Sequence, residues 1–269
     1  TAYGDWSNER SFTTTERTAN LIFSEYIEGS SNNKALEIAN LGNDEVNLST
    51  YQIAQSNNGN GWQYYHTFPE GAMIAAGGVY VLANASIDIA LYDTTNADEV
   101  LDYPSVVHHN GNDARALIRV LNTDTIFIDV FGDPDNDPGS GWDVAGVTEA
   151  TKDHTLLRKP NVEGGVTNPL SSFGNDEDDS QWIVKTNNDF NDLGTIASKF
   201  NLSENGITVL CPYAEIGESG IINGITYTKR SKEQITTENA STTCTSGVTD
   251  LSKLFEGKND FNGDISHWD

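Results

Sequence analysis

An acidic loop of sequence DPDNDPGSGW carries the residues of this chain whose types and spacing best suit metal binding. Asp133, Asp135 and Asp137 alternate along it, and Asp143 follows directly. Alternating carboxylates on a tight turn can direct several oxygens at one hard cation, as Ca²⁺ prefers. The loop departs from the EF-hand pattern, because Gly139 is one position late and no glutamate stands at the twelfth position. The four aspartates are candidate Ca²⁺ ligands; the alternative is a purely structural Pro-Gly turn.

Aromatic residues form a second candidate site after a loop rich in glycine and asparagine. Trp62, Tyr64 and Tyr65 are followed directly by His66. Exposed aromatic rings on loops can stack on sugars or anchor a protein partner. The alternative is that the cluster is a buried lid over one end of the fold.

Catalytic constellations are missing from the sequence. It contains neither the G-x-S-x-G nor the H-E-x-x-H pattern. Adjacent residues of a strand point to opposite faces, so His108 and His109 do not form a zinc site together. Glu37 alternates with Leu36 and Ile38, which predicts a solvent-facing carboxylate on a half-buried strand. We therefore expect no enzymatic activity from these residues.

Charge limits the classes of partner. The formal net charge is −25 and the isoelectric point is about 4.2. Such a surface repels phosphate backbones, so direct nucleic-acid binding is not expected. An acidic surface suits a saline extracellular setting and favours divalent cations, although solubility alone is an alternative reason for it. No apolar run approaches the roughly 18 residues that a transmembrane helix needs.

The two cysteines, Cys211 and Cys244, indicate one disulfide and an oxidising compartment. The alternative is two unrelated buried thiols.

Short apolar runs separated by turns dominate the rest of the chain. Frequent Asn-Gly dipeptides favour tight hairpins. Many short strands with frequent turns predict a β-sandwich or barrel. Two short helices are predicted, at Ser86–Tyr92 and, after a capping box formed by Ser231 and Gln234, at Ser231–Asn239. The clearest predicted strands are Leu21–Phe23, Leu36–Ile38, Val79–Leu82, Ala116–Val120, Ile126–Phe131 and Trp182–Val184.

Four separated blocks together resemble one known family. In chain order they are SEYIEGSSNNKALEIAN at Ser24–Asn40, NGNDAR at Asn110–Arg115, the DPDNDPGSGW loop, and TLLRKP at Thr155–Pro160. This order is similar to that of the lamin-tail domain of secreted bacterial proteins, over roughly Thr18 to Ile196. The resemblance implies an immunoglobulin-like β-sandwich that normally has no catalytic role. It also implies a structural salt bridge or turn contact for Glu28 near Lys34. For the basic pair Arg158-Lys159 we expect a buried or semi-buried ion pair with a nearby carboxylate.

The flanking segments complete the expected organisation, which is mostly β with a small α+β module. Residues 1–17 resemble the end strand of a fibronectin type III domain or a linker, and 18–200 form the lamin-tail-like sandwich. Residues 201–246 form a small disulfide-tied linker module. Residues 247–269 resemble the start of a bacterial surface-protein repeat of roughly 26 residues, within the usual period of stacked repeats. We interpret the chain as a segment of a longer protein.

The sequence therefore favours a non-catalytic structural or binding module of a secreted or cell-surface bacterial protein. Its role would be adhesion, spacing or presentation, with neighbouring domains and a cell-surface glycan or protein ligand as partners. One alternative is an accessory domain of a secreted nuclease or other hydrolase. Another is a carbohydrate-binding module that uses the aromatic cluster at Trp62, Tyr64 and Tyr65.

Overall fold

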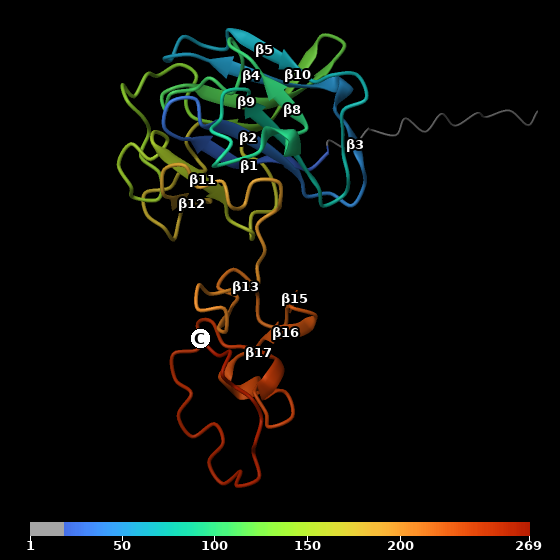
Figure 1. Ribbon diagram of the computed structural model, residues 1–269, viewed down its shortest axis with the longest axis vertical. Coiled ribbons are helices and arrows are strands. Elements are labelled where there is room, and N and C mark those ends of the chain that lie inside the picture. Colours follow the sequence, from blue (N-terminus) through green and yellow to red (C-terminus); the bar gives the residue numbers. More distant parts are fainter. Residues whose placement is uncertain (1–18) are drawn as a thin grey trace, which may run out of the picture.

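Two β-sheets packed face to face form the larger part of the molecule (Figure 1). The computed structural model describes residues 19–269, so the fibronectin-like segment expected at 1–17 lies outside it. The six-stranded sheet has the order β12-β11-β1-β2-β7-β8, and the four-stranded sheet has the order β10-β9-β4-β5. Neighbouring strands in both sheets are antiparallel except β7 and β8. The expected immunoglobulin-like β-sandwich is confirmed.

The strands of the six-stranded sheet are β1 (Leu21–Glu28), β2 (Lys34–Asn40), β7 (Val79–Asn84), β8 (Glu99–Leu101), β11 (His154–Arg158) and β12 (Trp182–Lys185). Those of the four-stranded sheet are β4 (Tyr51–Ser56), β5 (Tyr64–Thr67), β9 (Ala114–Leu121) and β10 (Asp124–Phe131). All six strands predicted from apolar runs lie within these elements. The short elements are β3 (Val46–Asn47), β6 (Met73–Ile74) and the 3-10 turns η1 (Leu48–Thr50) and η2 (Thr94–Asn96).

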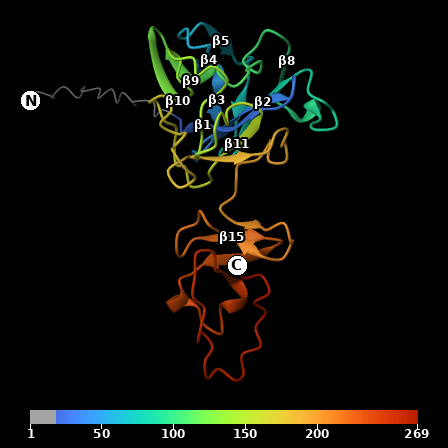
Figure 2. The ribbon, with the colours of Figure 1, turned by 90° about the vertical axis from the view of Figure 1, so that its left-hand side faces the viewer.

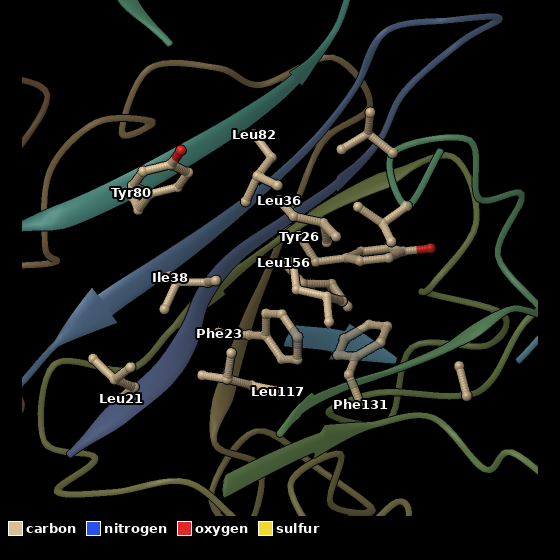
Figure 3. Packing of buried hydrophobic residues seen from close by; sticks show 14 of the residues in the cluster. Leu21, Phe23, Tyr26, Leu36, Ile38, Tyr80, Leu82, Leu117, Phe131 and Leu156 are labelled. Carbon is tan, nitrogen blue, oxygen red and sulfur yellow. The ribbon is translucent and has the colours of Figure 1, made fainter. Parts of the chain in front are cut away.

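The core lies between the two sheets, as Figure 3 shows. Phe23 from β1 meets Leu117 from β9 and Phe131 from β10 there. Along β2, Leu36 and Ile38 enter this core because alternate residues of a strand share a face. Each fully buried side chain of this size contributes roughly 1.5–3 kcal/mol relative to an exposed one.

The outer face of the six-stranded sheet is also covered. Residues 186–196, here called the strap, cross this face, where Phe190 joins a second apolar cluster with Ile27, Ala35 and Ala83. Glu37 therefore is fully buried, and the prediction that it faces solvent is wrong. Local alternation predicted its face correctly, but a segment far along the chain closes that face.

The prediction of a helix at Ser86–Tyr92 is wrong, because these residues form turns. The amides of Leu91 and Tyr92 both donate to the Asp88 carbonyl, while the Asp88 carboxylate accepts from Ala90 N at 3.0 Å. Such local side-chain bonds compete with helix formation. The capping box at Ser231 is confirmed, but it starts only the 3-10 turn η3 (Lys232–Gln234).

A buried ion pair joins the two sheets. Asp129 of β10 lies 3.2 Å from the Arg158 guanidinium of β11, and both side chains are almost fully buried. The same carboxylate accepts from Phe23 N at 2.9 Å and Val166 N at 2.8 Å. Arg158 also donates to the Gln181 side chain at 2.7 Å and stacks over the Trp182 ring. The expected ion pairs of Arg158 and of Lys34 with Glu28 are both present.

A smaller group of strands with its own apolar cluster follows the strap (Figures 1 and 2). Cys211 and Cys244 form a disulfide inside it, with Cα atoms 6.3 Å apart. Residues near the C-terminus pack on this group, since His267 O accepts from Val209 N and Trp268 Nε1 donates to Ala240 O. Its elements are β13 (Asn201–Leu202), β14 (Val209–Leu210), β15 (Ser219–Ile222), β16 (Ile225–Lys229), β17 (Thr243–Cys244), η3 and η4 (Ala240–Thr242). Within residues 19–269, no helix is long and apolar enough to cross a membrane.

Replacing Asp129 by alanine should strongly destabilise the sandwich. The change leaves the Arg158 charge and two backbone N–H groups buried without their acceptor, which typically costs about 3–5 kcal/mol. Urea unfolding followed by tryptophan fluorescence measures this. Asp250→Ala is the matched control, because Asp250 pairs with Lys232 at the surface. Equal losses in the two variants would contradict the assigned role of Asp129.

Replacing both cysteines by serine should destabilise the C-terminal group of strands and leave the sandwich transition in place. The bond closes a loop with a sequence separation of 33, which corresponds to roughly 3–4 kcal/mol in the chain-entropy description. Differential scanning calorimetry of the variant measures the loss. Thiol titration of the denatured, unreduced wild type is the companion test, and two free thiols would rule out the disulfide.

Candidate functional site

A groove of about 790 Å³ lies between the edge strands of the two sheets. One rim is formed by β5 of the four-stranded sheet, and the other by β8 and the residues that follow it. Tyr64 stands on the first rim with 57% of its surface exposed, and Tyr103 on the second with 78% exposed. Exposed aromatic rings flanking a groove are suited to ligand contact, because they carry large apolar surface and a polar hydroxyl.

The three aromatic residues predicted to bind a ligand have different positions. Tyr64 is paired across β5 and β4 with Gln55, and both line the groove. Tyr65 also lines the groove and is exposed. Trp62, by contrast, is half-buried against Ala54 and other apolar residues of the four-stranded sheet.

The His108 ring contacts the Tyr103 ring edge-on, with the two ring centroids 5.2 Å apart. The Asn84 amide nitrogen lies 3.0 Å from His108 Nε2, and Ser105 Oγ lies 2.8 Å from Nδ1. An amide nitrogen only donates, so Nε2 accepts and the proton resides on Nδ1, which donates to Ser105. Burial lowers the pKa of His108, which keeps the ring neutral. The His108 ring that contacts Tyr103 is therefore held in one orientation.

A polar contact ties the two rims together farther along the groove. His66 Nε2 of β5 lies 3.2 Å from the Glu99 carboxylate of β8. Tyr80 of β7 donates to the same carboxylate at 3.3 Å. Desolvation and the neighbouring Glu99 charge raise the pKa of Tyr80 well above its usual value, so its hydroxyl remains a donor.

Amide side chains supply most of the polar lining. Gln55 Nε2 donates to Asn57 Oδ1 at 2.5 Å, and Asn112 Nδ2 donates to Asn58 Oδ1 at 2.9 Å. Asn58 N donates to Asp113, whose pKa is raised by burial. The lining also contains Asn110 and Asp102 but no lysine or arginine. The groove is thus polar and uncharged to slightly acidic.

The predicted Ca²⁺ ligands are not brought together. Asp133 accepts from Asp135 N at 3.0 Å, Asp137 accepts from Gly139 N at 2.8 Å, and Asp143 accepts from Glu149 N at 2.8 Å. In the described part of the chain, no group of three or more histidine, cysteine or acidic residues is arranged to hold a metal ion. These carboxylates instead stabilise the turns of their own loop, as the structural alternative proposed.

A pair of buried carboxyl groups lies beneath the strap. Glu25 and Glu37 stand directly opposite each other on β1 and β2. Glu37 accepts from Ser24 Oγ and from Gly194 N, each at 2.6 Å. Glu25 is fully buried, and neither of its oxygens has a hydrogen-bond partner. Desolvation, reinforced by Glu37, raises the pKa of Glu25 to about 9, and desolvation raises that of Glu37 to about 7. Glu25 is therefore protonated at neutral pH.

Part of the chain matches the model of a known family. Residues 14–134 match the family model described as Lamin Tail Domain. This region is similar to lamin tail domains. No curated protein matches the chain. Among solved structures, the chain is similar to a DUF4876 family protein from Bacteroides thetaiotaomicron, with 14% identity and a TM-score of 0.39, covering 67% of this chain and 72% of the other.

The groove lies wholly within the lamin tail domain match, since its lining runs from Gln55 to Asp113. The strap and the Arg158 end of the buried ion pair lie beyond the match. Sequence reasoning found one rim of the groove, in Tyr64 and Tyr65, and missed Tyr103. A tyrosine directly before a proline, in the run DYPS, was the available signal.

The buried carboxyl pair predicts a stability that declines as pH rises. Both folded-state pKa values lie above the ordinary value of 4.5. The contribution of the protonated groups is therefore complete below pH 4.5 and is lost as pH rises through about 7 and then about 9, by up to about 1.4 kcal/mol per pH unit for each group.

Glu25→Gln should remove the upper part of that decline. Urea unfolding at pH 5, 7 and 9 should give equal stability to wild type at pH 5 and greater stability at pH 9. Glu70→Gln, at an exposed position, is the control. Parallel curves for wild type and Glu25→Gln would show that the Glu25 carboxyl does not titrate in this way.

Proposed function

We propose that this chain is a non-catalytic binding module of a secreted or cell-surface multidomain bacterial protein, with the groove between β5 and β8 as its ligand-binding surface. The observation that supports this most directly is the pair of exposed rings, Tyr64 and Tyr103, that face solvent from opposite rims. Adhesion or presentation of a bound partner is the corresponding role.

The chemistry of the groove favours binding over catalysis. Ser105 and His108 are in contact and superficially resemble a nucleophile and its base. However, His108 accepts from Asn84 through Nε2, so Nδ1 carries the proton and donates to the serine oxygen. A protonated nitrogen cannot remove the hydroxyl proton from Ser105. This pair therefore serves to hold the Tyr103 platform.

The extracellular setting is supported by two further features. The disulfide between Cys211 and Cys244 is of a kind that persists in oxidising compartments. The net charge of −25 keeps the chain soluble and repels polyanions. Ligands that are neutral or positively charged are therefore favoured over nucleic acids.

The proposal is tested by incubating the full chain with an array that carries neutral glycans, acidic glycans and short peptides of varied charge. We expect binding to at least one class, with a loss of roughly tenfold for each ring removed in Tyr64→Ala and Tyr103→Ala. Phe127→Ala is the matched control, because Phe127 is a partly exposed aromatic residue outside the groove. Binding that survives the double tyrosine variant would place the ligand site elsewhere.

A further inference from the structure

We infer that the groove between β5 and β8 takes a neutral oligosaccharide. This inference rests on the proposed binding function and assigns the chemical class of its ligand. It is supported by three properties of the lining: the aromatic platforms, the amide groups and the charge.

The first property is the position of the two tyrosine platforms. Tyr64 belongs to an edge strand of one sheet, and Tyr103 follows an edge strand of the other. A pyranose ring presents apolar C–H faces with hydroxyl groups around its edge, which matches an aromatic face beside polar groups. Two such platforms on opposite rims can hold separate sugar units of one chain, while the groove between them receives the hydroxyl groups.

The second property is the amide lining. Gln55, Asn57, Asn58 and Asn110 each carry both a donor and an acceptor. A sugar hydroxyl also donates and accepts, so amides satisfy it in either role. Gln55 and Asn57 are already joined to each other, and Asn58 is held by Asn112. This preorganisation lowers the entropy lost when a ligand orders the site.

The third property is the charge of the lining. Asp102 and Asp113 are its carboxylates, and it has no lysine or arginine. Sulfated, phosphorylated and uronic-acid sugars would be repelled by these carboxylates and by the acidic surface around them. The ligand class is therefore a neutral glycan. The volume of about 790 Å³ lies within the range of small-ligand sites, so a short oligosaccharide fills it.

A cationic peptide is the main competitor for this groove. Tyrosine rings attract cations, and the outer edge of β5 offers backbone groups to an added strand. The amides favour the glycan, because four amide side chains outnumber the two carboxylates that would hold a cation. Asp113 is also partly occupied by Asn58 N.

The test uses the full chain with neutral glycans, uronic-acid oligosaccharides and lysine- or arginine-rich peptides as probes. Isothermal titration of the strongest neutral glycan from the array should give a dissociation constant that changes less than about twofold between low and high NaCl, because no charge pair is involved. Tyr64→Ala and Tyr103→Ala should each weaken it roughly tenfold. Tyr64→Phe and Tyr103→Phe should bind within a few-fold of wild type, since the stacking face remains. Melting curves confirm that each variant is folded.

The outcomes separate the two proposals. If only cationic peptides bind, with an affinity that falls steeply with salt and with loss of Tyr103, the binding function stands and the glycan inference is overturned. Binding confined to acidic glycans overturns the inference in the same way. If no neutral glycan, acidic glycan or peptide binds, both the glycan inference and the proposed function of the groove fail.

Discussion

The sandwich depends on the buried carboxylate of Asp129, which lies where irregularities of two strands coincide. The register of β1 shifts between Phe23 and Glu25, and that of β10 shifts between Phe127 and Asp129. Shifts of this kind leave backbone groups without their usual partners. Asp129 accepts from Phe23 N of the opposite sheet and from Val166 N, and it neutralises Arg158. One side chain thus links the two sheets at a point where both strands are irregular. The groove depends on this, since its rims come from different sheets.

On the outer face of the six-stranded sheet, two buried carboxyl groups are accommodated in different ways. Glu37 accepts hydrogen bonds from Ser24 and Gly194, so the strap satisfies the carboxyl group that it covers. Glu25, directly opposite, receives none and is stabilised only by remaining protonated. Two adjacent carboxylates would repel each other in this setting, and removal of one charge relieves that repulsion. The strap is thus held by the hydrogen bond from Gly194 N to Glu37, and protonation of Glu25 removes the charge that it would otherwise bury.

The sequence predicted the features that depend on local pattern. Its predictions failed where a segment distant in the chain determines whether a residue is buried or exposed. Short apolar runs predicted the strands, and alternation along one of them placed Leu36 and Ile38 on the core face. The basic pair Arg158-Lys159 was expected to pair with a carboxylate, and Arg158 does so. Glu37 was predicted to face solvent because no residue near it in the chain indicates that the strap covers this face of the sheet. The Tyr64 rim of the groove was recognised as an aromatic cluster. Its partner Tyr103 was not, because only the parallel pairing of β7 with β8 brings that rim beside β5.

The groove and some of the contacts that stabilise the sandwich come from different parts of the chain. Every groove residue lies within the lamin tail domain match, whereas Arg158 and the strap, which brace the sandwich, lie after it. The rims themselves carry little of the core, since β8 has three residues and Tyr103 is mostly exposed. Residues at the rim can therefore change with limited cost to packing, because surface substitutions away from buried features alter stability little. The Ser105–His108–Asn84 set is the exception, because it links the His108 ring beside Tyr103 to the end of β7. The groove thus combines rims that can tolerate substitution with one fixed support, which is the combination that the proposed binding function needs.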